Sequence, residues 1–247
     1  MNNDLSGRCA LVTGSGRGIG SAIALELARA GAEIVLHYVN DSRSVEETGK
    51  KIMDSGGTYH IVQADLSAAE GAAGLIQLAG NVDILVLNAS VQFRKPWQQI
   101  TREEFDIQVN CNFYSSLALI QQAVPAMRKK KWGRIITIGS VQEAKPHPEM
   151  LVYSSSKAAQ TAMVRSLALQ LAGDGITVNN IAPGVIMTDR NTEALSNTAY
   201  AETVKASIPL GFFGEKEDCA GIVRLLCTED GRYITGQSIY VDGGKSL

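Results

Sequence analysis

The chain has 247 residues, of which 45% are hydrophobic and 19% are charged, and its formal net charge is −2. A polypeptide of this length can bury a large core, and many α/β proteins of this size form one domain. The slightly acidic balance argues against nucleic acid or an anionic membrane as an obligate partner, because both attract clusters of basic residues.

Short apolar segments alternate with helical segments along the whole chain. The predicted strands are rich in Val, Ile and Leu, as expected of parallel strands covered on both faces. They run over Ala10–Thr13, Glu33–Tyr38, Thr58–Gln63, Ile84–Leu87, Arg134–Gly139, Thr177–Ala182 and Ser238–Val241. The predicted helices run over Ser21–Ala30, Ser44–Ser55, Ala68–Ala79, Arg102–Met127, Tyr153–Ala172 and Lys216–Cys227. This alternation predicts one α/β domain over residues 1–247, with a doubly wound (Rossmann) parallel sheet of about seven strands and helices on both faces.

Neither end of the chain suggests a targeting or membrane segment. The residues Met1 to Asp4 carry no signal-peptide pattern, and no apolar stretch approaches the length of a membrane span. The four cysteines show no Cys-x-x-Cys spacing, and Cys9 and Cys111 lie in apolar runs, which favours core thiols. We therefore expect a cytoplasmic protein without a membrane partner. The three histidines are isolated in sequence, so we predict no metal site.

The first predicted strand leads directly into a glycine-rich turn and then a helix. A strand that passes through glycines into a helix start presents backbone N–H groups to a pyrophosphate. Glycine is needed there because a Cβ would block the close approach of the phosphate. The turn predicts a dinucleotide site that includes Gly14, Ser15, Gly16, Arg17, Gly18, Ile19 and Gly20.

Three polar residues farther along the chain add a chemical function to this site. Ser140 ends an apolar strand at its carboxyl side, where doubly wound sheets bind ligands, and its hydroxyl can polarise a carbonyl. Tyr153 and Lys157 lie one helical turn apart on the same helix face. An ammonium near a phenol favours the phenolate and so lowers the pKa of the tyrosine, which suits it to proton transfer. A Tyr/Lys pair alone is often only part of a solvated helix face, but the preceding Ser140 argues against that reading.

In this order and at these spacings, the glycine turn, Asn88-Ala89, Asn110, Ser140, Tyr153, Lys157 and Pro183-Gly184 resemble the short-chain dehydrogenase/reductase family. The resemblance runs from Leu5 to Gly244 and is greatest to the 3-oxoacyl-carrier-protein reductase and glucose dehydrogenase type. It implies an oxidoreductase that transfers a hydride between a nicotinamide cofactor and a small carbonyl or secondary alcohol, with Tyr153 as acid/base. It also implies a homotetramer and a substrate lid around residues 187–214.

The resemblance further implies roles for individual residues. Lys157 holds the nicotinamide ribose. Asn110 bends its helix and holds a water molecule. Asn112 is a second candidate for the role of Asn110, but Asn110 fits the register of the family pattern better. Asp65 accepts a hydrogen bond from the adenine amine. The remaining cofactor contacts are Tyr38, Asn40, Leu66, Asn88, Ala89, Ser90, Tyr153, Pro183, Gly184, Ile186 and Thr188. Ser90 stands where the family has glycine.

The choice between NADP and NAD depends on the end of the second strand. NAD-preferring folds usually carry an acidic residue there, which binds the ribose 2′-hydroxyl. Tyr38 occupies that position, and Arg17 in the turn suits a 2′-phosphate, although Asp41 lies near. The sequence therefore favours NADP, with NAD possible.

Two other functions and the substrate stay open at this point. A 3-oxoacyl-carrier-protein reductase is one alternative, but Asp174 and Phe212 stand where such enzymes tend to be basic. A non-catalytic dinucleotide-binding member of the fold is the other, and the retention of Ser140, Tyr153 and Lys157 argues against it. The polar loop from Gln142 to His147 favours a small polar carbonyl or polyol.

Overall fold

The strands of the computed structural model, which describes residues 4–68 and 70–247, form one seven-stranded sheet in the order β3-β2-β1-β4-β5-β6-β7. Every pair of neighbouring strands is parallel. The strands are β1 (Cys9–Val12), β2 (Glu33–Tyr38), β3 (Tyr59–Gln63), β4 (Ile84–Leu87), β5 (Gly133–Ile138), β6 (Ile176–Pro183) and β7 (Ser238–Val241). All seven predicted strands are confirmed, and their ends differ from the prediction by at most one residue.

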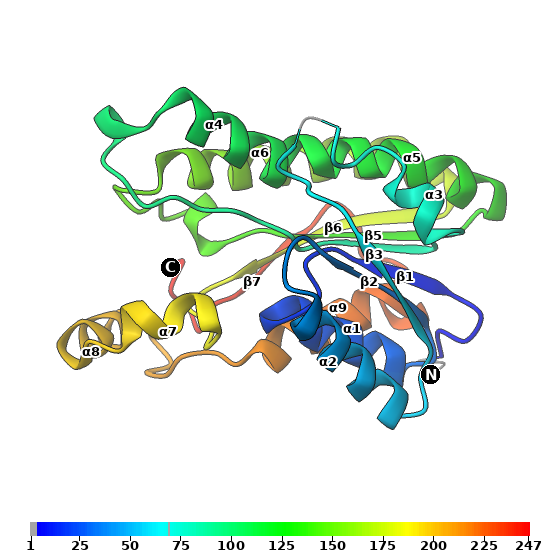
Figure 1. The fold of residues 1–247 in the computed structure, drawn as a ribbon, viewed down its shortest axis with the longest axis horizontal. Helices are drawn as coiled ribbons and strands as arrows, with labels where there is room; N and C mark the ends of the chain where they lie inside the picture. The colour runs from blue at the N-terminus through cyan, green and yellow to red at the C-terminus, as the bar shows by residue number, and fades with distance from the viewer. Residues whose placement is uncertain (1–3, 69) are drawn as a thin grey trace.

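Two layers of helices enclose the sheet (Figure 1). Helices α1 (Gly18–Arg29), α2 (Ser42–Asp54) and α9 (Lys216–Cys227) cover one face. Helices α4 (Arg102–Val109), α5 (Ser115–Lys130) and α6 (Leu151–Leu171) cover the other. Alternate residues of one strand enter opposite cores: in β1, Leu11 packs on the α5 and α6 side, whereas Ala10 and Val12 pack on the α1 and α9 side. This double burial explains why the strands are continuously apolar.

The third helix is shorter than predicted. It was expected over Ala68–Ala79, and the structure has α3 at Leu75–Ala79. One residue of the expected range, Ala69, lies outside the described residues. Two glycines account for the late start. A Cβ on Gly71 would lie 1.5 Å from the Asp65 carbonyl oxygen, and Gly74 has a left-handed φ of +74°. The chain therefore makes tight turns here before it becomes helical.

The helix predicted over Arg102–Met127 is interrupted. Helix α4 is followed by one π-helical segment, Asn110–Tyr114, and only then by α5. In this segment the N–H of Ser115 donates to the carbonyl of Asn110, five residues earlier. Such a bulge changes the direction in which the following side chains point, and it is frequent at functional sites.

The stretch from Met187 to Gly214, where the family resemblance implies a substrate lid, contains two short helices. These are α7 (Asp189–Leu195) and α8 (Thr198–Ala206). They project from the body of the molecule on the side of α1 and α2 (Figure 1). No helix within the described residues has the length and apolar character needed to cross a bilayer.

The order of strands reverses between β1 and β4, because the chain moves outward from β1 to β3 and then returns to start the other half at β4. In a doubly wound sheet, the crevice outside the carboxyl ends at such a reversal is where ligands bind. The topology thus brings the glycine turn after β1 next to the segments after β4 and β5.

His37 in β2 fixes the glycine turn to the sheet. Its side chain is fully buried, its Nδ1 accepts a hydrogen bond from the Gly14 N–H at 3.0 Å, and its Nε2 lies 3.0 Å from the Ala64 carbonyl oxygen. Both contacts are satisfied by the neutral ring with its proton on Nε2. Burial is the main reason that the pKa of His37 falls to about 4. His37 is therefore a packing residue whose two ring nitrogens both have partners.

We expect His37 to make the free energy of unfolding depend on pH. Because its pKa is lower in the folded than in the unfolded chain, its contribution is complete above about pH 6.5 and is lost as the pH falls toward 4. Between pH 8 and pH 5 the loss is about 2 kcal/mol. Urea unfolding at several pH values measures it. His37→Gln should remove this part of the pH dependence, whereas His60→Gln, at a partly exposed position, should leave it. Equal pH profiles for wild type and His37→Gln would contradict the assignment.

Candidate active site

The carboxyl ends of the strands open into one cleft of about 1170 Å³. Its walls come from the turns after β1 to β6, from α7 and α8, and from the C-terminal segment. Most of the predicted site residues line it, namely Gly14, Gly16, Arg17, Gly18, Ile19, Gly20, Tyr38, Asn40, Asp65, Leu66, Asn88, Ala89, Ser90, Ser140, Tyr153, Pro183, Gly184, Ile186 and Thr188. Three predicted residues, Ser15, Asn110 and Lys157, are not in this lining.

The glycine turn has the backbone shape that the sequence predicts. Gly14 and Gly18 have left-handed φ values of +63° and +58°. A Cβ on Gly20 would lie 2.4 Å from the Gly14 carbonyl oxygen, so the turn closes onto the first turn of α1 with no room for a side chain. Helix α1 starts at Gly18 without a side-chain cap and without an acidic residue in its first turn. Its first N–H groups are therefore suited to an anion.

Thr13 and Asn88 hold this turn against β4. The hydroxyl of Thr13 accepts hydrogen bonds from the N–H groups of Asn88 and Ala89, at 2.9 and 3.0 Å. The Asn88 amide donates to the carbonyls of Thr13 and Gly14, at 2.9 and 3.0 Å. Asn88 thus supports the turn rather than presenting its amide to a ligand. Ser15 has a similar role, because its hydroxyl accepts from the His37 N–H at 2.9 Å.

Asp41, the acidic residue near the end of β2, is a helix cap. Its carboxylate accepts hydrogen bonds from the backbone N–H of Ser44, at 3.1 Å, and from the Ser44 hydroxyl. These two bonds are the main reason that the pKa of Asp41 lies below its usual value, and Arg17 and Arg43 lower it further. Arg17 itself is exposed at the rim of the cleft.

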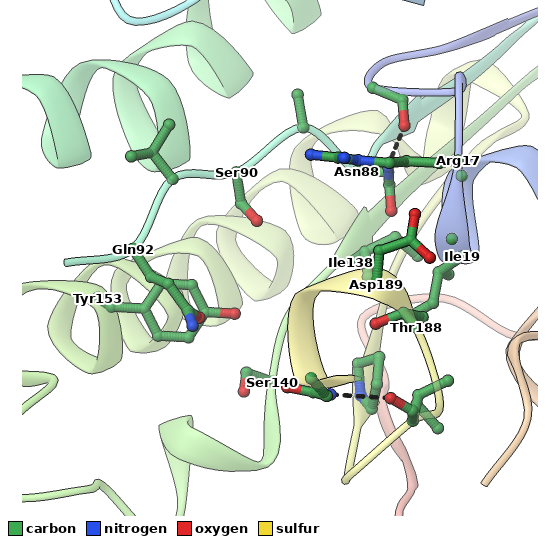
Figure 2. A pocket seen from close by; sticks show the side chains of 18 of the residues that line it. Arg17, Ile19, Asn88, Ser90, Gln92, Ile138, Ser140, Tyr153, Thr188 and Asp189 are labelled. Carbon is green, nitrogen blue, oxygen red and sulfur yellow. Dashed lines mark hydrogen bonds between the residues drawn. The ribbon is translucent and has the colours of Figure 1, made fainter. Parts of the chain in front are cut away.

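Ser140 and Tyr153 reach the cleft from two different elements (Figure 2). Ser140 follows β5 and caps a short 3₁₀ turn, where its Oγ accepts the Gln142 N–H at 3.2 Å. Tyr153 lies in the first turn of α6 and is 6% exposed. Both hydroxyl groups can therefore meet a ligand, although the rest of each residue is buried.

Lys157 is buried behind Tyr153, with 1% of its surface exposed. Its Nζ lies 5.7 Å from the centroid of the Tyr153 ring, so the two side chains share one face of α6 as predicted. The ammonium donates to the Ile138 carbonyl at 2.7 Å and to Oε1 of Gln160 at 3.3 Å. A positive charge is thus held in a fixed place beside the phenol.

The structure separates the two asparagines that the sequence leaves in competition. The Asn110 amide donates to the carbonyl of Ser67 at 3.2 Å and is not connected to α6 by any described hydrogen bond. Asn112 is fully buried, and its amide group bonds both the N–H and the carbonyl of Val91, each at 2.8 Å. It also donates to Ser156, whose hydroxyl donates to the Tyr153 carbonyl. Of the two asparagines, Asn112 is the one whose hydrogen bonds lead to α6 beside Tyr153, whereas Asn110 bonds to the segment after β3.

The segment after β6 forms the wall opposite the serine. A Cβ on Gly184 would lie 2.6 Å from the Cα of Asp242, which fixes Pro183-Gly184 tightly against the C-terminal segment. The carbonyl of Ile186 accepts from the Asn191 amide at 2.8 Å, which ties α7 to this wall. Thr188 lies close to Gly18, so the wall reaches back to the glycine turn.

Several lining residues were not predicted from the sequence. Gln92 and Arg94 follow β4 closely, so the rule that ligands meet strand ends could have indicated them. Tyr200 and Lys245 carry no such signal, because they belong to the α8 region and the C-terminal segment, which reach the cleft only through the tertiary fold.

Comparisons with known proteins agree with this geometry. A family model described as Enoyl-(Acyl carrier protein) reductase matches residues 14–246. The chain is 36% identical to a 3-oxoacyl-[acyl-carrier-protein] reductase of Rickettsia conorii, over 99% of each chain. It is 34% identical to 3beta-hydroxysteroid dehydrogenase 1 of Eggerthella lenta, over 100% of this chain and 97% of the relative.

Among solved structures, a 3-oxoacyl (acyl-carrier-protein) reductase from Agrobacterium tumefaciens C58 with NADP bound is 37% identical. It superimposes with a TM-score of 0.94 over 98% of this chain and 96% of that one. The fold, the strand-end cleft and these full-length matches agree, and the chain belongs to the short-chain dehydrogenase/reductase family, as an NAD(P)-dependent oxidoreductase.

Proposed function

We propose that the protein reduces a small carbonyl compound with NADPH, or oxidises the corresponding secondary alcohol, and that Tyr153 transfers the proton. One observation carries the proposal. Ser140 and Tyr153 open into the same cleft as the glycine turn, while the Lys157 ammonium is buried behind the phenol. A chain that only bound the dinucleotide would not need this arrangement.

The cleft fits a dinucleotide. The turn offers left-handed glycines and an uncapped helix start where a pyrophosphate needs N–H donors. A bound nicotinamide supplies the hydride, and the residues of this chain supply the rest. Ser140 donates a hydrogen bond to the carbonyl oxygen, and Tyr153 donates the proton that converts the resulting alkoxide to an alcohol. Lys157 stabilises the phenolate that remains, and Asn112 holds the kinked helix against α6.

The preference for NADP is supported by the charges around the end of β2. Tyr38 and Asn40 line the cleft there, where an NAD enzyme usually has a carboxylate. Asp41 is engaged in capping α2, and Arg17 stands at the rim with a guanidinium that suits a phosphate. The NADP-bound reductase from Agrobacterium adds to this support.

A 3-oxoacyl-carrier-protein reductase is the second candidate, because the relative from Rickettsia carries that name. Carrier proteins are acidic, so their reductases need basic residues on the docking face. Here Arg128 and Lys131 both pair with Asp174, at 2.7 and 3.0 Å. These ion pairs reduce the basic character of that surface, and we therefore favour a free small molecule as substrate.

We also propose a homotetramer that works in the cytoplasm. The exposed face of α6 carries Ala158, Ala162, Ser166 and Leu169, whereas the partly buried Met163 packs against the core of the subunit. Small residues let two helices approach closely, and Leu169 is 86% exposed, which favours a partner surface. At the other edge, Tyr240 of β7 is partly exposed. The four cysteines are free thiols, which suits a reducing compartment.

Replacing Tyr153 by Phe should abolish proton transfer while the ring still packs in place. We expect kcat to fall by about 10²- to 10⁴-fold, the usual contribution of a positioned acid, and the Kd for NADPH to change little. NADPH oxidation with a panel of ketones measures the first quantity, and fluorescence titration measures the second. Tyr233→Phe, at a fully exposed position, serves as control. Turnover within tenfold of wild type would refute the role of Tyr153.

Replacing Arg17 by Ala should weaken NADPH binding far more than NADH binding. Loss of a charge-assisted contact to the 2′-phosphate corresponds to about tenfold to a hundredfold in Kd. Parallel titrations with both cofactors measure the effect, and Arg29→Ala, at the exposed end of the same helix, is the control. An equal loss for both cofactors would show that Arg17 only shapes the turn.

In solution, light scattering should give a mass of four times the 26.4 kDa subunit. Ala162→Arg places a long charged side chain on the exposed face of α6 and should reduce the mass to that of a dimer. Asp54→Arg, at an exposed position of α2, should leave the tetramer intact. A monomeric wild-type protein at micromolar concentration would defeat the proposal.

A further inference from the structure

The substrate side of the cleft is lined by hydrogen-bond donors. Of the Asp, His, Lys and Arg residues in the cleft lining, Arg17, His37, Asp41 and Asp65 belong to the glycine turn, to β2 and to the segments after β2 and β3. Asp189 follows Thr188, which lies 3.5 Å from the position of a Cβ on Gly18, and Figure 2 shows it on the side of Arg17 and Ile19. The other residues of these four types in the lining are Arg94, His147 and Lys245.

Arg94 and His147 meet in a way that leaves one donor without an acceptor. Nη2 of Arg94 lies 2.9 Å from Nε2 of His147, and the backbone N–H of Glu149 lies 3.1 Å from Nδ1 of the same ring. Burial and the charge of Arg94 lower the pKa of His147, so the ring is neutral at physiological pH. A neutral imidazole accepts only one hydrogen bond, and its other nitrogen carries a proton. Two donors therefore face each other at one of these contacts.

This donor pair is held rigidly with respect to the catalytic residues. The backbone N–H of His147 donates to Oε1 of Gln142 at 2.6 Å, and Gln142 lies two residues after Ser140. The N–H of Lys95 donates to the Glu149 carbonyl at 2.9 Å, which joins the Arg94 segment to the His147 segment. Nε of Arg94 donates to the Glu149 carboxylate at 3.1 Å and fixes the guanidinium.

Lys245 adds positive charge from the C-terminal segment. Its Nζ donates to the neutral hydroxyl of Ser207 at 2.5 Å. Its pKa is lowered, first by burial and then by the nearby Lys145 ammonium. An uncharged apolar substrate that covered Lys245 and Arg94 would remove water from both charged groups and offer no hydrogen bonds in its place. This desolvation would cost binding free energy.

We infer that the substrate is a keto acid or hydroxy acid, whose carboxylate accepts hydrogen bonds from both Arg94 and His147. One anionic oxygen placed between Nη2 and the Nε2 proton of the ring gives each donor an acceptor. The guanidinium keeps its hydrogen bond to Glu149, and the positive charge of Lys245, in the lining of the same cleft, attracts the carboxylate. This inference rests on the proposed function and deepens it by naming the substrate class.

The test compares matched substrates that differ only in the carboxylate. Steady-state rates with NADPH are measured for acetoacetate against methyl acetoacetate, levulinate against methyl levulinate, and 5-keto-D-gluconate against L-sorbose. We expect kcat/KM to be at least about tenfold higher for the acid in one or more pairs. Arg94→Gln should lower kcat/KM for that acid by about tenfold to a hundredfold, and by at least tenfold more than for its neutral partner. Arg102→Gln, an exposed arginine on α4, is the matched control.

Each outcome decides the inference. If the neutral member of every pair is reduced as well as the acid, or if Arg94→Gln affects both members equally, the inference is wrong although the proposed function stands. If no compound is reduced, calorimetry on the enzyme–NADP complex compares D-gluconate with D-glucitol. Selective gluconate binding that Arg94→Gln removes would support the anion site, and its absence would overturn it. Failure of the proposed function appears separately, as the absence of NADPH oxidation with every ketone of the panel used for Tyr153→Phe.

Discussion

The hydrogen bond from the Lys157 ammonium to the Ile138 carbonyl holds the reactive part of the molecule together. It joins α6 to the end of β5, two residues before Ser140, so the serine and the tyrosine keep one relative position. A lysine buried to 1% exposure would be costly without such acceptors. The burial is useful because a charge in a medium of low polarity acts strongly on the nearby phenol. The chemistry therefore depends on a contact that is itself part of the core.

A second polar cluster supports the same region from the other side. Glu143, three residues after Ser140, accepts hydrogen bonds from Thr161 of α6 at 2.8 Å and from Ser238 of β7 at 2.7 Å. The Asn180 amide of β6 also donates to it. One carboxylate thus ties the serine loop to three elements that are far apart in sequence. Networks of this kind hold a unique arrangement only when each member has partners, as these members do.

The sequence predicted the sheet and the grouping of Ser140, Tyr153 and Lys157 because both follow from local patterns. Apolar runs of four to eight residues mark buried parallel strands, and a glycine turn, a strand-end serine and a Tyr/Lys pair one turn apart are short-range features. Asn112 could not be chosen over Asn110 in this way. Asn112 lies in the π-helical segment and bonds to Val91, which is 21 residues away, so its position depends on a tertiary contact. The shortened α3 depends likewise on how closely Gly71 packs on Asp65.

The two halves of the cleft are built from different kinds of structure, and this explains why one family serves many substrates. The cofactor half is made of strand ends and glycines, where larger side chains do not fit. A Cβ on Gly20, for example, would lie 2.4 Å from the Gly14 carbonyl oxygen. The substrate half is made of loops, α7, α8 and the C-terminal segment. Two relatives that are 34% and 36% identical to this chain accordingly carry names that refer to a steroid and to a carrier-bound acyl group. Overall similarity then says little about the substrate, and the charges of Arg94 and Lys245, with the hydrogen-bonding groups of His147, are the more direct guide.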